Sequence, residues 1–438
     1  MPQKTSDTTR RTVLRSIGAT TLLTAAAGCM GGGGDDDAGN RYWTTQVEED
    51  RQQVIDGLLE RFEDEHDGEL ELITVEEDDV PSQISSAQAS DRLPSIAELP
   101  LDPMQTLGGE GLLSADGAES VIDGVGEDEF FEGALDLTTS PDGDRFAVPM
   151  HGWVQGFWYR QDRFDELGLA EPTDWDSLLE AAEALYDPDN DEYGIVVGSD
   201  ETAYARQCFT PFARSNGARV FDEDGEIVFD SDEMVEALEF YGSLAEYSPP
   251  GNNTWEDANN TFMNHQSHLI EYSSYIMGDI GDSDAVDAEN VGFTSFLDNE
   301  RQSSFGAILT LNLLDTASDD ERGVATEFAE FLLTDEEYIE YLHMAPGGMN
   351  PVLRETSQSE AYRDNEVLQE WDENTLEDIS GAFETMERFG YVDGEMFPEF
   401  SEITSRFLVA EAVQRVSDGD DPETVAEEQA DQMRDAIN

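Results

Sequence analysis

The sequence predicts an α/β fold with two lobes, and three observations lead to this prediction. The chain has 438 residues, which is more than one ordinary hydrophobic core encloses. Strand-like and helix-like patterns alternate along most of its length. A strand-like run over residues 146–160 contains Pro149 and two glycines, a combination expected where strands cross from one lobe to the other.

The first part of the chain predicts three strands and a helix. Residues 42–45, 70–75 and 95–101 have strand character, and apolar residues recur at helical spacing from 54 to 62. In open α/β sheets the ligand cleft lies beyond the carboxyl ends of the strands. These strand ends supply the first candidate ligand-binding residues, which are Trp43, Thr44, Glu76 and Asp102.

The later elements are mostly predicted helices. Residues 173–179 open a helix with an N-cap residue and early acidic residues. Apolar residues at helical spacing predict further helices at 231–247, 321–333 and 335–343. The stretch from 400 to 438 also has a helical pattern, with acidic residues on its outer side.

Acidic residues dominate the composition. The chain has 22 Lys and Arg against 101 Asp and Glu, a net charge of −79, and its only lysine is Lys4. Such charge strains a compact fold through self-repulsion, whereas molar salt shortens the Debye length to about 3 Å and screens it. We therefore expect a protein from an extreme halophile. The charge disfavours a nucleic-acid partner, and the apolar periodicity argues against disorder.

The N-terminus predicts export and attachment to a membrane. Arg10 and Arg11 precede a short apolar run over residues 17–27, which is too short to span a bilayer and resembles a twin-arginine export signal. The run ends in Ala-Ala-Gly-Cys, which resembles a lipobox, so removal of residues 1–28 would leave Cys29 lipidated. Ordinary cleavage with Cys29 left free is the alternative. Residues 29–40 then form a flexible tether rich in Gly and Asp.

Several motifs in a fixed order resemble those of family 1 extracellular solute-binding proteins. Within residues 146–186 the matching elements are Tyr159-Arg160, Leu167-Gly168, Pro172-Thr173 and Trp175-Asp176. Further matches follow at residues 221–226, 237–241, 262–263, 268–270, 328–335 and 347–351. The resemblance covers about residues 41–360. One departure is that Ser273-Ser274-Tyr275 stands where the family usually has a small residue, Pro and Trp.

The resemblance implies a maltose-binding-protein-like architecture, the type II periplasmic-binding-protein fold. Each lobe would be a mixed sheet flanked by helices, and hinge crossings would join the two lobes. Residues 41–149 with 277–345 would form lobe 1, and residues 150–276 with 346–438 would form lobe 2. Family members deliver sugars and related solutes to the membrane subunits of ABC permeases. We expect a monomeric, lipid-anchored protein on the extracellular face of the cell membrane that binds without catalysis.

A sugar site needs rings to stack on C–H faces and carboxylates or amides to take hydroxyl groups. The aromatic candidates near strand ends or crossings are Trp43, Trp153, Tyr204, Trp255, Tyr272 and Tyr275. The polar candidates are Glu76, Asp102, Gln155, Glu271, Asn312 and Asn350. Core packing is the alternative role for each aromatic residue, and for Trp158 it is the expected one.

Other readings of the sequence are weaker. His265, His268 and Glu271 have the spacing of metal ligands, but a helix turn explains this spacing better. Residues 187–194 resemble a calcium-binding loop that lacks the Gly and the bidentate Glu of such loops, so a turn is expected there. No cofactor or metal is predicted, and Cys208 reads as a buried free thiol. A polyamine or glycerol phosphate is the alternative solute, although anions are disfavoured by the few basic residues. A secreted glycosidase with paired carboxylates is the alternative function.

Overall fold

The computed structural model describes residues 40–437, except for 91, 141, 142, 282, 284, 316, 393 and 394. The predicted export signal with Arg10 and Arg11, the predicted lipidation site Cys29 and the tether up to residue 39 therefore lie outside the described residues. Among the described residues, no helix combines the length and the apolar character that a bilayer crossing needs.

The three strands predicted near the N-terminus are confirmed. Strand β1 (Arg41–Thr44) pairs in parallel with both β2 (Glu71–Thr74) and β3 (Ile96–Pro100). The predicted helix between the first two strands is α1 (Glu49–Glu65), and α2 (Val80–Ala89) joins the second to the third. Helix α1 forms because its apolar residues recur on one face, and that face is buried.

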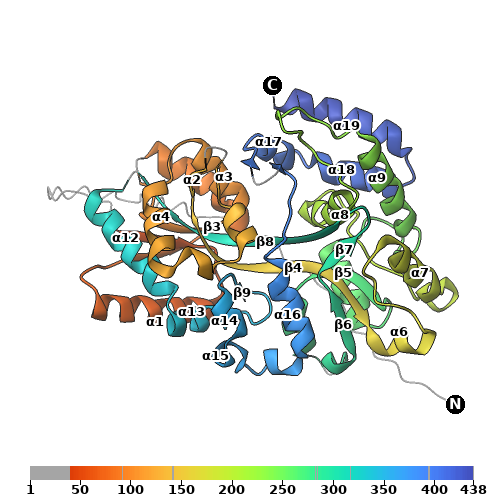
Figure 1. Cartoon of the computed structure of the whole chain (residues 1–438), viewed down its shortest axis with the longest axis horizontal. Coiled ribbons are helices and arrows are strands. Elements are labelled where there is room, and N and C mark those ends of the chain that lie inside the picture. Colours follow the sequence, from red (N-terminus) through yellow and green to blue (C-terminus); the bar gives the residue numbers. More distant parts are fainter. Residues whose placement is uncertain are drawn as a thin grey trace, which may run out of the picture. The chain divides into compact units, whose positions relative to one another are not determined.

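Two long antiparallel strands connect the two ends of the sheet (Figure 1). Strand β4 (Val148–Arg160) pairs with β8 (Gln302–Leu313) through its first half, and β8 pairs with β3. The second half of β4 pairs with β5 (Leu269–Ser273) and β6 (Val291–Thr294). The crossing predicted at residues 146–160 is therefore confirmed, and the sheet runs in the order β2-β1-β3-β8-β4-β5.

Smaller strands complete the sheet around the crossing. Strand β7 (Phe296–Asp298) pairs with the start of β8, and β9 (Asn350–Pro351) pairs with β4 at His151 and Gly152. Residues 291–298, predicted as part of lobe 1, thus pair at the same end of the sheet as β5, which was predicted as part of lobe 2. A separate hairpin is made by β10 (Tyr391–Val392) and β11 (Glu395–Met396).

Helices cover both ends of the sheet. The end with β1 to β3 carries α3 (Leu101–Gly109), α4 (Ala115–Val125), α12 (Asp319–Leu332) and α13 (Asp335–Leu342), with α12 packed on α4. The other end carries α6 (Gln161–Leu167), α7 (Trp175–Leu185), α8 (Ala203–Ser215), α9 (Asp232–Ala245) and α10 (Trp255–Met263). The helices predicted at 173–179, 231–247, 321–333 and 335–343 are confirmed. The helix turn expected for His265, His268 and Glu271 is wrong, because α10 ends at Met263 and Glu271 lies in β5.

The C-terminal region is helical, as predicted. Helices α17 (Phe400–Ser405), α18 (Leu408–Ser417) and α19 (Pro422–Ala436) follow one another, and α18 packs against α8, α9 and α19. Shorter helices near the crossing are α5 (Glu132–Asp136), α11 (Ile276–Gly281), α14 (Arg354–Gln358), α15 (Glu360–Arg363) and α16 (Glu373–Ala382).

Trp158 and Cys208 lie in the core, as the sequence predicted. Trp158 is fully buried, its ring centroid lies 4.2 Å from that of Phe293, and its indole N–H donates to the Tyr272 carbonyl at 3.0 Å. A buried indole needs such a partner, because an unmet donor in the interior is unfavourable. Cys208 is a buried free thiol in α8.

Candidate ligand-binding site

A cavity of about 560 Å³ lies among α2, α3, α8, α17 and α18. Its volume is in the range of pockets that hold small molecules. Its apolar lining includes Pro81, Ile84, Pro103, Ile403 and Phe407. Its hydroxyl groups come from Ser85, Thr106, Thr202, Ser401 and Thr404, and its charged residues are Glu77, Asp102, Glu110, Arg206 and Glu402. Because α2 and α3 follow β2 and β3 whereas α8 packs at the other end of the sheet, both ends contribute walls.

Asp102 is the predicted candidate that the structure brings to this cavity. It lies in the first turn of α3, directly after β3, where the helix dipole favours a carboxylate. Its carboxylate is 3.8 Å from the Arg206 guanidinium and 3.5 Å from the Arg388 guanidinium. Asp102 therefore joins α3 to residues at the other side of the cavity.

The two arginines were not predicted from the sequence. Arg206 lies in α8 and is 8% exposed, and burial lowers its pKa while Asp102 opposes that shift. Arg388 is 7% exposed, donates to the Gly306 carbonyl at 3.0 Å and lies 5.3 Å above the Phe305 ring. The signal was available, since a basic residue amid the apolar run of α8 is unusual in a chain with so few basic residues.

Phe407 is a second residue that the sequence did not reveal. It lines the cavity, is 44% exposed and has a left-handed backbone with φ of 54°. A bulky residue in this region is strained, and such strain clusters at functional positions. The sequence reading took the C-terminal stretch as helical throughout, whereas Phe407 separates α17 from α18 and turns an aromatic ring toward the cavity wall.

Tyr275 follows β5 and does not line the cavity. Burial raises its pKa to about 12, the Arg51 charge opposes this, and Glu98 and the cavity residue Glu77 add to it. Gly348 is needed at this place, because a Cβ there would lie 2.2 Å from the Tyr275 ring. Contact of Tyr275 with a ligand therefore stays a prediction.

Strand β1 is held by a buried carboxylate that the sequence did not point to. Glu98 in β3 is fully buried and accepts hydrogen bonds from Gln46 Nε2 at 2.9 Å and Tyr341 Oη at 2.6 Å. His151 Nε2 lies 3.1 Å from the Glu98 carboxylate, and the hydroxyls of Tyr42 and Thr44 also donate to this carboxylate. Burial acts to raise the pKa of Glu98, but these hydrogen bonds and the His151 charge lower it below its ordinary value.

The candidates on the crossing strands mostly hold the crossing together. Gln155 is buried and donates to Cys208 Sγ at 3.1 Å. Asn350 donates to the Gly347 carbonyl at 2.6 Å and to Ser274 Oγ at 3.1 Å. Trp153 is partly exposed, with its ring centroid 6.0 Å from that of Phe305. None of these described residues lines the cavity, so their contact with a ligand stays a prediction.

The remaining candidates are dispersed. Trp43 is 7% exposed, Glu76 is exposed, and Trp255 is 53% exposed at the start of α10. Tyr204 is buried and donates to the Glu271 carbonyl at 2.6 Å. The rings of Tyr204 and Tyr272 lie 6.5 Å apart, so these two pack on each other.

Glu271 and Asn312 are interior residues, contrary to their predicted place at a ligand. Asn312 is fully buried and donates to the Ala97 carbonyl at 3.1 Å, which ties β8 to β3. Glu271 is fully buried, and its carboxyl oxygens make no hydrogen bond to any residue that the structure describes. Burial raises the pKa of Glu271 well above its ordinary value, because a charged carboxylate is unfavourable in the interior.

Replacing Glu271 with Gln is expected to stabilise the fold. Because the folded pKa is raised, stability falls as pH rises above the pKa of the unfolded chain, and an amide removes that loss. We expect a gain of about 1–2 kcal/mol near pH 8 and little gain near pH 4, measured by urea unfolding. The matched control is Glu239→Gln on the exposed face of α9, which should change little. A Glu271→Gln variant that is less stable near pH 8 would show that the carboxylate is needed.

The family model for bacterial extracellular solute-binding proteins matches residues 46–339. The chain belongs to this family. A relative of nearly full length is YcjN of Escherichia coli (strain K12), named as an ABC transporter periplasmic-binding protein, at 31% identity over 86% of this chain and 87% of that one. The mannitol-binding protein of Pseudomonas aeruginosa is 35% identical over 25% of this chain and 26% of its own.

Solved structures confirm the fold of this solute-binding protein. Maltose-bound MalE3 of T. maritima superimposes with a TM-score of 0.72 at 19% identity, over 90% of this chain and 99% of that one. A tagatose-bound solute-binding protein from Thermotoga lettingae gives a TM-score of 0.72 at 19% identity, over 91% and 99%. The predicted type II periplasmic-binding-protein fold, an α/β fold with mixed sheets and hinge crossings, is therefore confirmed.

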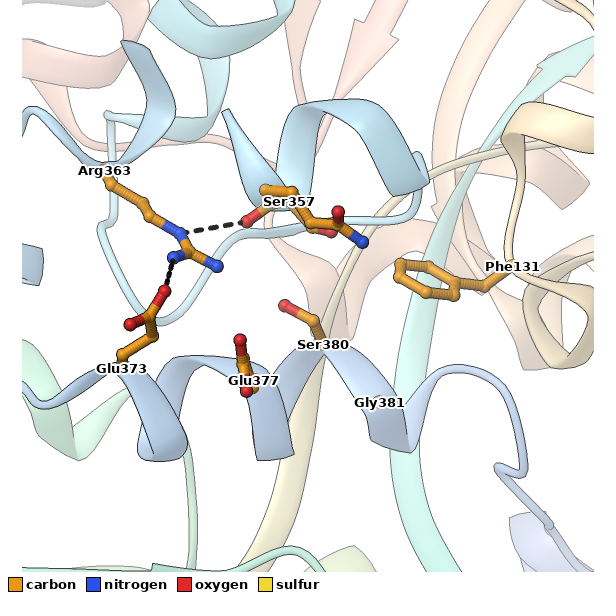
Figure 2. Close-up of a pocket in the computed structure, with 8 residues that line it drawn as sticks. Phe131, Ser357, Arg363, Glu373, Glu377, Ser380 and Gly381 are labelled. Atoms are coloured by element: carbon orange, nitrogen blue, oxygen red, sulfur yellow. Dashed lines mark hydrogen bonds and ion pairs between the residues drawn. The ribbon is translucent and has the colours of Figure 1, made fainter. Parts of the chain in front are cut away.

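The remaining features of this solute-binding protein lie outside the cavity among α2, α3 and α8. A second cavity, of about 440 Å³, lies between α14, α15 and α16, where Arg363 donates to Glu373 at 3.1 Å (Figure 2). Among the described residues, no group of three or more His, Cys, Asp or Glu could hold a metal ion. Residues 187–192 form the predicted turn, and His265 bonds Arg160 at 2.7 Å.

Proposed function

We propose that this solute-binding protein captures a sugar or a related polyhydroxylated solute in the cavity of about 560 Å³ and delivers it to an ABC permease. The observation that carries the proposal is the composition of the cavity, which combines hydroxyl and carboxylate acceptors with apolar side chains and the ring of Phe407. Such a surface suits a molecule with hydroxyl edges and C–H faces. The named ligands of relatives and structural neighbours, which include mannitol, maltose and tagatose, support it.

Capture depends on movement about the crossing strands. The register of β4 against β8 shifts between Pro149 and His151, and Tyr338 Oη bonds the Met150 carbonyl there while accepting from Val352 N at 3.0 Å. A solute that contacts α3 and α8 together stabilises the closed arrangement, because it makes both sets of contacts only there. The proposed lobes are those of the sequence prediction, except that residues 291–298 belong with β5 in lobe 2. The protein releases its solute unchanged.

The location of the protein is part of the proposal. Export by a twin-arginine signal that includes Arg10 and Arg11, followed by lipidation of Cys29, would place a monomer on the extracellular face of the membrane. Mass spectrometry of the mature protein would show a lipid on residue 29, and Cys29→Ser should release the protein into the medium. A membrane-bound Cys29→Ser protein would contradict this anchor.

The Phe407→Ala variant tests the proposed site. Stacking of a ring on a sugar face is worth about 0.5–1.5 kcal/mol, so we expect an affinity about tenfold weaker by calorimetry in molar KCl. The thermal midpoint should change little, because Phe407 is 44% exposed and alanine keeps the Cβ that this left-handed position already holds. Leu167→Ala in α6 is the matched control, since Leu167 is equally exposed at 45% and does not line the cavity. Equal affinities for the two variants would remove Phe407 from the site.

A further inference from the structure

The guanidinium of Arg206 is a buried cation that faces the cavity without a hydrogen bond. Arg206 lines the cavity and is 8% exposed. Its side chain makes no hydrogen bond to any residue that the structure describes, and its ion pair with Asp102 is 3.8 Å long. A guanidinium has five N–H donors, and an acceptor on a molecule in the cavity can take those that the protein leaves free. The geometry therefore leaves a place for an acceptor in the cavity.

Two guanidinium groups lie on either side of Asp102 at this place, although the cavity lining and the chain as a whole hold more acidic than basic residues. Arg388 lies on the other side of Asp102, at 3.5 Å. Within the described part of the chain, Asp102 is the only acid at ion-pair distance from either arginine, so two cations share one anion. The other acids of the cavity lining, Glu77, Glu110 and Glu402, are exposed to solvent, which screens them.

The start of α8 adds to this positive end. Thr202 caps the helix, and both Thr202 and Ala203 line the same cavity as Arg206. The unpaired N–H groups and the dipole at the N-terminus of a 13-residue helix favour a negative group. Arg206 belongs to the first turns of the same helix, so the helix end and the guanidinium favour an anionic oxygen group at the same wall.

We propose that the solute is a sugar acid whose carboxylate is bound by Arg206, with Asp102 retained by Arg388. This inference rests on the proposed function and narrows its solute class. A carboxylate matches the fork of the guanidinium, and one negative charge balances the net positive charge of the two arginines and Asp102. The low number of basic residues in the sequence disfavoured an anionic solute, but the placement of Arg206 and Arg388 at the cavity favours one.

The test is calorimetry in molar KCl with glucuronate, galacturonate and gluconate, each beside glucose or galactose as its neutral counterpart. We expect at least one acid to bind at least about tenfold tighter than its counterpart. Arg206→Gln should weaken the affinity for that acid about a hundredfold, and Arg206→Lys should weaken it less. The thermal midpoints of both variants should be unchanged. Asp102→Asn removes the carboxylate that competes for Arg206, so the affinity for the acid should rise several-fold. If Asp102 instead holds the two sides of the cavity together, the affinity should fall.

The outcomes separate this inference from the proposed function. Binding of neutral sugars alone, or equal affinity of the Arg206→Gln variant for the acid, would overturn the sugar-acid inference and leave sugar capture standing. Preferential binding of glycerol 3-phosphate, included in the same panel, would also overturn the sugar-acid class. Failure of every sugar and sugar acid to bind would contradict the proposed function itself.

Discussion

The Glu98→Ala variant is expected to lose about 4 kcal/mol of unfolding free energy, because five side chains share this one buried acceptor. Alanine leaves Gln46, His151 and Tyr341 without their buried partner. Gln46 also accepts from Arg51 at 2.8 Å, so the start of α1 should loosen as well. Urea unfolding followed by tryptophan fluorescence measures the loss.

The Glu98→Gln variant is the matched control, since it keeps the shape of the side chain and one acceptor oxygen. It should lose less than the alanine variant. Because the pKa of Glu98 is held below its ordinary value, its contribution is present above the pKa of the unfolded chain and is lost as pH falls through the folded value. Both variants should therefore show a smaller loss of stability on acidification than the wild-type protein. An alanine variant with wild-type stability at neutral pH would contradict the role of Glu98.

Removal of salt is expected to unfold the protein. The chain has a net charge of −79, and in molar KCl its carboxylates are screened from one another because the Debye length is about 3 Å. At about 0.01 M salt the Debye length is about 30 Å, so the carboxylates repel one another. Dialysis into dilute buffer should abolish the folded circular dichroism signal at neutral pH. This result would support the predicted halophilic origin.

A control separates charge screening from other effects of salt. Acidification to about pH 4.5 in dilute buffer protonates part of the carboxylates and should recover some of the folded signal, whereas sucrose in dilute buffer should recover less. A protein that stays folded in dilute buffer at neutral pH would contradict the interpretation of its composition.

The sequence was informative where one local pattern decides an element. Helical spacing located α9, α12 and α13, because each helix buries one face, and short strand-like runs located β1 to β3. The aromatic run with Pro149 located the crossing strand β4, because a strand covered on both sides is apolar throughout. The lobe assignment of residues 291–298 depends on pairing with a distant strand, which no local pattern encodes.

The site was harder to predict, because it forms from segments far apart in the chain. Asp102 could be found at a strand end, where the fold places ligands. Phe407 could not, since its place depends on a left-handed backbone. Arg206 was missed, although a basic residue inside the apolar run of α8 was a signal for it. Glu271 was misplaced because a carboxylate usually lies at the surface, and only the fold shows that this one is enclosed.

A crystal structure of the protein with the tightest-binding solute of the calorimetric panel would decide where the ligand lies. We expect the solute between α3 and α8, with Asp102 and Arg206 at its polar edge and the ring of Phe407 on its apolar face. A solute bound in the cavity beside α16, or on the surface away from both sides of the crossing strands, would contradict capture at this site.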